Sequence, residues 1–193
     1  MSAPVPSASQ AERAAAGHDG TMPGKVRTLP VLAQRGWGEP FGVVQVQVVR
    51  LPHASDLPLP KYARRGDAGL DLSAAVPAGE RWEIEPRGCL LIPTGLCVAL
   101  PPGFELQIRS RSGLANKHSV CVLNAPGTVD MGYRGEVGVL LINLGRAAFP
   151  IERGDRIAQA VLSMVPRLEW EEVPVLDATE RGSGGWGSTG EGA

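Results

Sequence analysis

Apolar and polar residues alternate along much of the chain from position 43 onward. In residues 43–49, Val44, Val46 and Val48 alternate with Gln45 and Gln47. In residues 104–109 (FELQIR), three apolar side chains likewise alternate with three polar or charged ones. Successive side chains of a strand point to opposite faces, so a period of two residues indicates a strand with one buried face. The pattern predicts a strand in each of the two segments.

Further short apolar runs recur at intervals of about ten residues and are separated by turns that contain glycine and proline. They predict strands at residues 81–85, 89–92, 96–100, 119–123, 137–143 and 157–165. Residues 112–117 alone are predicted to be helical. Many short strands joined by tight turns are typical of an all-β barrel or jelly roll.

The two ends of the chain differ from the middle in composition. Residues 1–40 are rich in Ala, Pro, Gly and Ser and lack periodicity, so we expect a disordered N-terminal extension. Residues 41–176 are predicted to form the barrel domain. Residues 177–193 contain RGSGGWGSTG and are predicted to form a flexible, glycine-rich C-terminal arm.

Charge and composition exclude several classes of partner. The chain has 19 basic and 20 acidic residues, with a net charge of −1, and so exerts no general attraction on nucleic acid or an anionic membrane. No apolar run approaches the roughly 18 residues of a membrane helix, and no signal-peptide pattern is present at the N-terminus. Three cysteines without metal-ligand spacing are expected to be packed free thiols in a reducing compartment. We therefore expect a cytoplasmic protein with neither nucleic-acid nor membrane partners.

Five segments combine small residues with charged ones. Each alone has an ordinary explanation, such as a turn, a helix start, a hairpin, an edge strand or a linker. The segments are residues 68–75 (AGLDLSAA), 109–115 (RSRSGLA), 124–143 (NAPGTVDMGYRGEVGVLLIN), 153–162 (RGDRIAQAVL) and the C-terminal arm.

Taken together, these segments indicate a site for a nucleotide polyphosphate. Arg111, Ser112 and Gly113 offer a guanidinium, a hydroxyl and backbone N–H groups at a helix start, which is how proteins hold phosphate oxygens. Asp130 and Tyr133 offer a general base beside a ring that can stack on a sugar. The arm offers unobstructed backbone donors from its glycines. It also carries charge, hydroxyls and a ring suited to stacking on a base, from Arg181, Ser188, Thr189 and Trp186.

The order, spacing and content of the five segments resemble those of the trimeric deoxyuridine triphosphatases (dUTP diphosphatases), from about residue 43 to residue 190. The resemblance implies an eight-stranded, jelly-roll-like β-barrel (a dUTPase-like β-clip) assembled as a homotrimer. Each active site would draw the first, second and fourth segments from one subunit and the third from another. The arm of the remaining subunit would close over that site.

The resemblance also implies the reaction: dUTP and water give dUMP and diphosphate, with Mg²⁺ as cofactor. This reaction would limit uracil incorporation into DNA and supply dUMP for dTMP synthesis. By the same resemblance, Asp130 would hold and deprotonate the water that attacks the α-phosphorus. Asp71 would contact Mg²⁺ through the water shell of the metal.

Roles in substrate binding follow from the same resemblance. The phosphate chain would be held by Arg111, Ser112, Gly113 and Gln159, with Arg181, Ser188 and Thr189 added from the arm. Asn124 would bind the uracil edge, and Tyr133 would pack against the deoxyribose and exclude a 2′-hydroxyl. Trp186 would cap the uracil at a position where the family commonly has Phe or His.

Two alternatives remain at this point. A deoxycytidine triphosphate deaminase shares the fold but needs a glutamate on the strand after the turn at residues 133–135. Here Glu136 lies close to the turn, and residues 137–142 contain no acid. A non-catalytic nucleotide-binding protein would be expected to lack Asp130, Asp71 or an arm residue, and none is missing.

Overall fold

The computed structural model describes residues 42–185. The predicted extension at residues 1–40 and the arm residues Trp186, Ser188 and Thr189 lie outside this range. The predicted domain boundaries stay predictions.

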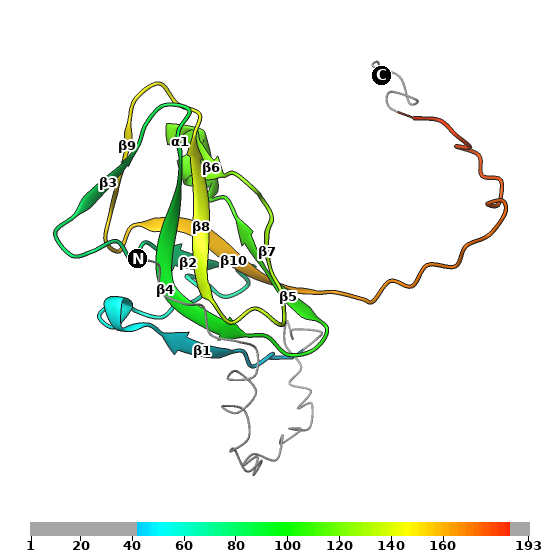
Figure 1. Cartoon of the computed structure of the whole chain (residues 1–193), viewed down its shortest axis with the longest axis horizontal. Coiled ribbons are helices and arrows are strands. Elements are labelled where there is room, and N and C mark those ends of the chain that lie inside the picture. Colours follow the sequence, from blue (N-terminus) through cyan, green and yellow to red (C-terminus); the bar gives the residue numbers. More distant parts are fainter. Residues whose placement is uncertain (1–41, 186–193) are drawn as a thin grey trace, which may run out of the picture. The chain divides into compact units, whose positions relative to one another are not determined.

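The regular secondary structure of the described part of the chain is almost entirely β, so the all-β prediction is confirmed (Figure 1). The helical elements are one 3₁₀ turn, η2 (Pro52–Ala54), and one helix, α1 (Ser112–His118). The strands are β1 (Gln47–Arg50), β2 (Leu70–Ser73), β3 (Arg81–Ile84), β4 (Cys89–Ala99), β5 (Phe104–Arg109), β6 (Val120–Val122), β7 (Gly127–Val129), β8 (Glu136–Asn143), β9 (Phe149–Glu152) and β10 (Arg156–Met164).

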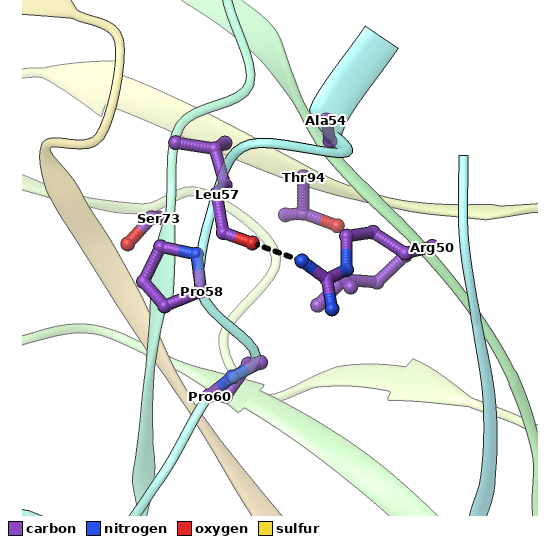
Figure 2. A pocket seen from close by; sticks show the side chains of 8 residues that line it. Arg50, Ala54, Leu57, Pro58, Pro60, Ser73 and Thr94 are labelled. Carbon is purple, nitrogen blue, oxygen red and sulfur yellow. Dashed lines mark hydrogen bonds between the residues drawn. The ribbon is translucent and has the colours of Figure 1, made fainter. Parts of the chain in front are cut away.

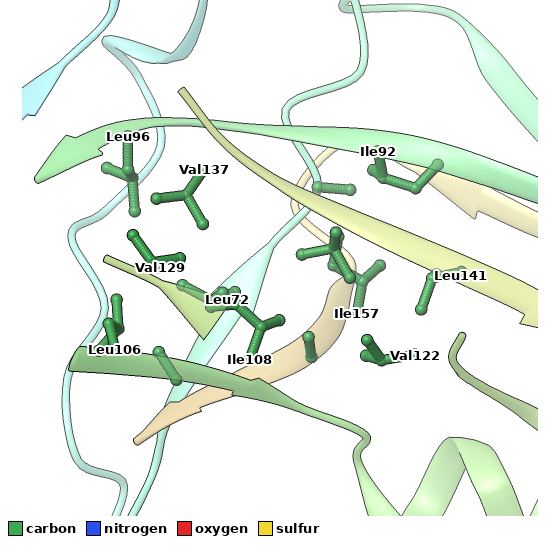
Figure 3. Packing of buried hydrophobic residues seen from close by; sticks show 14 of the residues in the cluster. Leu72, Ile92, Leu96, Leu106, Ile108, Val122, Val129, Val137, Leu141 and Ile157 are labelled. Atoms are coloured by element: carbon green, nitrogen blue, oxygen red, sulfur yellow. The ribbon is translucent and has the colours of Figure 1, made fainter. Parts of the chain in front are cut away.

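Two four-stranded sheets and a two-stranded ribbon build the jelly-roll-like barrel. One sheet has the order β1-β4-β8-β6, the other has the order β2-β10-β5-β7, and β3 pairs with β9. Neighbouring strands run antiparallel. The apolar faces of the large sheets pack together, as Figure 3 shows for Leu106 and Ile108 of β5 and for Val137 and Leu141 of β8. The alternation predicted for β5 is confirmed, because its inward side chains are buried and Arg109 is exposed.

β4 departs from the prediction. The sequence predicted two strands, at residues 89–92 and 96–100, whereas β4 is continuous through a register shift between Pro93 and Cys97. Gly95 lies in this bulge with a φ of 70°, where glycine is favoured. A Cβ at Gly95 would lie 1.9 Å from the Cβ of Ala54 in η2. The sequence did not predict this continuity, because a close contact with a distant segment leaves no local sequence pattern.

β1 also differs from its prediction. The strand covers Gln47–Arg50 instead of residues 43–49, and its side chains are exposed, including Val48 at 42%. β1 lies at the edge of its sheet and pairs with β4, so neither of its faces is covered within the described chain. The strands β2, β7 and β9 were not among the predicted strands. The predicted helix is confirmed and extends by one residue, to His118.

The segment after η2 is held against the barrel by Arg50. Its Nη1 atom donates to the carbonyl oxygen of Ser55 at 3.0 Å and to that of Leu57 at 2.8 Å. Figure 2 shows the bond to Leu57. The cavity beside this contact measures only about 10 Å³, which is too small for a ligand. Arg50 thus fixes the start of the segment that leads into β2.

A buried asparagine at the end of β8 also joins separate parts of the fold. The side chain of Asn143 is fully buried and donates from Nδ2 to the carbonyl oxygens of Ile84 and Ala147, while its Oδ1 accepts from the N–H of Gly145. A buried amide is stable only when its polar atoms are paired, and this one ties β8 to β3 and to the loop before β9.

The three cysteines are free thiols, but Cys89 is exposed, so the expectation that all three are packed is wrong for this residue. It is the first residue of β4, and its side chain lies on the outer face of the strand. Between residues 42 and 185, no helix has the length and apolar character needed to span a membrane.

Candidate active site

A carboxylate on β2 lies between two guanidinium groups. Nε of Arg111 donates to Oδ1 of Asp71 at 2.9 Å, and Nη1 of Arg156 donates to Oδ2 at 3.1 Å. Nη1 of Arg111 also donates to the backbone oxygen of Arg156, at 2.9 Å. The side chains of Asp71 and Arg111 are 29% and 24% exposed, so solvent weakens the ion pair between them less than it would on an open surface.

Gln159 lies directly opposite Asp71 in the sheet. β10 pairs Gln159 with Asp71 on one side and with Arg109 on the other, so the three residues form a row across β2, β10 and β5. The Nε2 atom of Gln159 donates to the backbone oxygen of Ser110, at 2.9 Å. Its Oε1 lies over Gly69, where a Cβ would come within 2.5 Å.

A cavity of about 210 Å³ lies beside this row. Asp71 and Gln159 line it together with Lys61, Asp67 and Gly69 of the loop before β2. The cavity therefore brings the cationic side chain of Lys61, the acidic side chain of Asp67 and the amide of Gln159 next to the Asp71–Arg111 pair.

Ser112 and Gly113 form the first turn of α1. Arg111 is the N-cap residue, and the first helical bond runs from the N–H of Ala115 to the oxygen of Arg111. Helix geometry therefore leaves the N–H groups of Ser112, Gly113 and Leu114 without an acceptor inside the helix. Space around Gly113 is open, because a Cβ there would meet nothing within 4 Å.

The turn between β7 and β8 carries Asp130 and Tyr133. The N–H of Tyr133 donates to the oxygen of Asp130 at 3.0 Å, which closes the turn. The Tyr133 hydroxyl donates to the backbone oxygen of Glu136 at 2.9 Å, and the ring lies over Gly135. Asp130 and Tyr133 line one cavity of about 170 Å³ with Val137.

Asn124 comes before β7 in the sequence, whereas Asp130 and Tyr133 follow this strand. Its side chain packs over Gly127, where a Cβ would lie 3.1 Å from Nδ2. The glycine thus leaves room for the amide beside the backbone of β7.

Within one chain, the site residues fall into two groups that lie at opposite ends of β5. One group surrounds the Asp71–Arg111 pair, and the other lies on the turn that carries Asp130 and Tyr133. Arg109, at the end of β5, pairs with Gln159, whereas Leu106 pairs with Val129, the residue before Asp130. Continuing this register places Asp130 opposite Glu105, four residues before Arg109, or about 13 Å along a strand. The Asp71–Arg111 pair and the Asp130 turn therefore do not meet within one chain.

Arg181 is the one predicted site residue of the arm that lies within the described residues. Its Nε donates to the oxygen of Gly184 at 3.1 Å, and the N–H of Gly184 donates back to the oxygen of Arg181 at 3.0 Å. The bonds found for Arg181 lie inside the arm.

Arg153 holds the turn before β10. It donates from Nη1 to the oxygen of Val76 and from Nη2 to the oxygen of His53, both at 2.7 Å, and it pairs with the carboxylate of Asp56. The hydrogen bond from Arg153 lowers the pKa of Asp56 below its ordinary value of 3.8, and a backbone hydrogen bond acts in the same direction. Arg153 therefore has a structural role next to the site.

Two neighbours of the predicted residues had been missed. Arg156 was not assigned a role, although it shares Asp71 with Arg111. Glu136 was noted only as an acid close to the turn, yet it is the first residue of β8, and its Oε1 accepts from the N–H of Gly95 at 2.6 Å. Neither contact has a local signal, since each joins strands distant in sequence.

Comparison with known proteins places this arrangement in a family. The dUTPase family model matches residues 55–190. This range includes the first four segments and the arm up to residue 190. The chain belongs to the dUTPase family.

Relatives in the dUTPase family resemble this chain over most of their length. The deoxyuridine 5′-triphosphate nucleotidohydrolase of Methylocella silvestris is 55% identical over 148 residues, which cover 77% of this chain and 92% of that protein. The protein of the same description from Beijerinckia indica is 53% identical over 149 residues, with 77% and 93% covered. Among solved structures, the dUTPase of Staphylococcus bacteriophage 80alpha with dUpNHpp is 26% identical, with a TM-score of 0.68. The match covers 76% of this chain and 99% of the phage dUTPase.

Proposed function

We propose that this chain hydrolyses dUTP to dUMP and diphosphate. The observation that carries the proposal is the cavity at the β7–β8 turn, which a carboxylate and an aromatic ring, those of Asp130 and Tyr133, line together. Such a pair suits a nucleoside whose sugar stacks on the ring while its phosphate is attacked beside the carboxylate. The names of the relatives support dUTP as the nucleotide.

In the proposed reaction, Asp130 acts as general base. Its carboxylate accepts a proton from a water molecule while the water oxygen bonds to the α-phosphorus. The bond from the α-phosphorus to the oxygen bridging to the β-phosphorus breaks, and diphosphate leaves with the electron pair. A positioned base of this kind contributes about 10²–10⁴-fold to the rate.

Arg111, Ser112, Gly113 and Gln159 would hold the phosphate chain. Arg111 has five N–H donors, and its bonds to Asp71 and to the Arg156 backbone leave others free to bind phosphate oxygens. The first-turn N–H groups of α1 provide neutral donors next to this charge. In the arm, Arg181 would reach the γ-phosphate, and Ser188 and Thr189, outside the described residues, would assist.

The donor set suits Mg²⁺ bound mainly by phosphate and water. Residues 42–185 contain no cluster of three or more His, Cys, Asp or Glu side chains able to enclose a metal. Asp71 borders the 210 Å³ cavity, and each of its oxygens keeps acceptor capacity beside its arginine bond. Asp71 would thus hold waters of the metal, as Mg²⁺ sites commonly do. When bound, Mg²⁺ neutralises charge on the leaving diphosphate. A dUTPase mutant from phage phi11 of S. aureus has been described with a structural Mg(II) ion.

Nucleoside recognition would rest on the third segment and the arm. Asn124 would bind the uracil edge, and Tyr133 would pack against the deoxyribose and exclude a 2′-hydroxyl. Trp186, which lies outside the described residues, would cap the base. By removing dUTP, the reaction would limit uracil incorporation into DNA and supply dUMP for dTMP synthesis; a cytoplasmic location fits this role and stays a prediction.

A homotrimer with shared sites would bring the two groups of residues together. The separation of Asp130 from Asp71 and Arg111 along β5 supports this proposal, because one chain alone does not assemble the whole set. Exposed apolar side chains from the end of β10 to the start of the arm also support it, since such surface is commonly covered by a partner. They are Met164, Val165, Leu168, Trp170, Val173, Val175 and Leu176.

Mixing two inactive variants tests the shared site. Asp130→Asn chains and Arg111→Ala chains are each expected to be inactive alone. Refolded together in equal amounts as trimers, they are expected to recover about a quarter of the wild-type activity, because random assembly gives about a quarter of all sites an intact Asp130 from one subunit and an intact Arg111 from another. No recovery in mixed trimers of confirmed mass contradicts sharing between these two groups.

The function itself is tested with a panel of dUTP, dCTP, dTTP and UTP with Mg²⁺, with the products separated by chromatography. We expect dUMP and diphosphate from dUTP alone. Ammonia released from dCTP, or no turnover of any of the four, contradicts the proposal.

A further inference from the structure

The bulge in β4 exposes a backbone donor that the strand ladder does not pair. At the bulge, the N–H of Gly95 donates to Oε1 of Glu136 at 2.6 Å, and Nε2 of His53 lies 3.1 Å from the same oxygen. Glu136 therefore replaces the missing ladder acceptor and joins β8 to both β4 and η2.

The bulge is tightly packed on its other side. The oxygen of Gly95 accepts from the N–H of Leu51 at 2.8 Å, and no side chain fits at Gly95 beside Ala54. The contacts with Leu51 and Ala54 thus fix the position of Gly95. Its N–H in turn fixes the position of the Glu136 carboxylate.

The backbone of Glu136 faces the candidate active site. Its carbonyl oxygen accepts the Tyr133 hydroxyl at 2.9 Å, and the Tyr133 ring lies over Gly135. The position of this ring next to Asp130 therefore depends on where the first residue of β8 is held. The carboxylate of Glu136 holds this residue through its bonds to Gly95 and His53.

We propose that Glu136 is a positioning residue for Tyr133, through its bond to the β4 bulge, and thereby sets the selectivity for the deoxyribose. The inference rests on the proposed function, because it assumes that Tyr133 packs against the sugar. A looser Glu136 would let the ring move away and admit a 2′-hydroxyl.

The test compares dUTP and UTP kinetics in Glu136→Ala, Glu136→Gln and wild type. We expect Glu136→Ala to raise KM for dUTP about tenfold, to lower the preference for dUTP over UTP by a similar factor, and to change kcat less than about threefold. Glu136→Gln is expected to restore most of both values, because its amide oxygen can still accept from Gly95. Glu83→Ala is the matched control, since Glu83 lies on β3 and pairs with Arg81 at the surface.

A double-mutant cycle with Tyr133→Phe separates positioning from general loosening. Tyr133→Phe removes the bond to the Glu136 oxygen, so adding Glu136→Ala is expected to cause less than about a twofold further loss of selectivity. If the alanine variant does not fold, Glu136→Asp takes its place, because its shorter side chain withdraws from Gly95. The same loss of selectivity for dUTP over UTP is expected. Unchanged selectivity in a folded Glu136 variant, or full additivity in the cycle, overturns the inference. Wild type that fails to hydrolyse dUTP refutes the proposed function instead.

Discussion

Arg111, the N-cap residue of α1, forms an ion pair with Asp71 of β2, 40 residues earlier in the sequence, with Nε 2.9 Å from Oδ1. Arg156 binds the other oxygen of the same carboxylate. Asp71 thus divides its charge between two arginines. If Arg111 leaves Asp71 to bind a phosphate, Arg156 still pairs with the Asp71 carboxylate. The carboxylate then keeps one cationic partner, so the movement of Arg111 costs less free energy.

Replacing Arg156 with alanine tests this balance. With Arg156 gone, Asp71 would hold Arg111 more strongly, and we expect KM for dUTP to rise about five- to tenfold. Stability is expected to change little, because the Arg156 side chain is 60% exposed. Steady-state kinetics at saturating Mg²⁺ measure the effect. Arg156→Lys should give an intermediate KM, and an unchanged KM in the alanine variant would show that Arg111 does not depend on Arg156.

Replacing Asp130 with asparagine tests the general base. The variant keeps the shape of the side chain but has no carboxylate to accept the proton. We expect kcat to fall about 10²–10⁴-fold, while binding of dUpNHpp measured by calorimetry stays near the wild-type value. Retained turnover would remove Asp130 from the role of base; lost binding together with lost turnover would point to a structural role.

Truncation after Glu180 tests the arm. The side chains of residues 171–183 are exposed, so the barrel does not depend on them for its core. We expect the melting temperature to stay close to that of the full chain and kcat/KM for dUTP to fall about a hundredfold or more, because a closing segment positions the substrate. A truncated protein that is unfolded, or one that is fully active, contradicts this account.

Substitution of Gly69 by alanine tests the position of Gln159. The new Cβ would lie 2.5 Å from Oε1 of Gln159 and 3.3 Å from its Cβ, so the side chain must move. Since the end of a glutamine side chain is flexible, we expect little loss of stability. The amide would leave the oxygen of Ser110, and KM for dUTP is expected to rise several-fold. An unchanged KM would mean that Gln159 does not hold the phosphate chain.

The Asp56–Arg153 pair makes stability depend on pH in acid. Because the pKa of Asp56 is lowered below 3.8 in the folded protein, the unfolded chain binds this proton more tightly. The pair therefore stabilises the fold above that pH, and its contribution is lost as the pH falls through the lowered pKa. We expect Asp56→Asn to lower the melting temperature at pH 7, with the difference from wild type shrinking below pH 3.8. Asp177→Asn, in the exposed segment after the barrel, is the control. A difference that is constant across this range would refute the assignment.

The sequence alone predicts much of the secondary structure of this protein and identifies its family. The period of two in β5, the turns between strands and the short helix at Ser112 arise from local preferences, so the sequence determined them without knowledge of the partners. The five segments, with their order and residue types, likewise identify the family, because they are properties of the chain itself.

Tertiary structure alone decided which residues meet. The continuous β4 with its bulge, the exposure of β1, the sharing of Asp71 by two arginines and the contact of Glu136 with Gly95 all depend on strand register. Register is set by packing between segments distant in the chain, which leaves no periodic trace in either of them. The same register places Asp130 and Arg111 toward opposite ends of β5, a separation that the linear order of the motifs does not reveal.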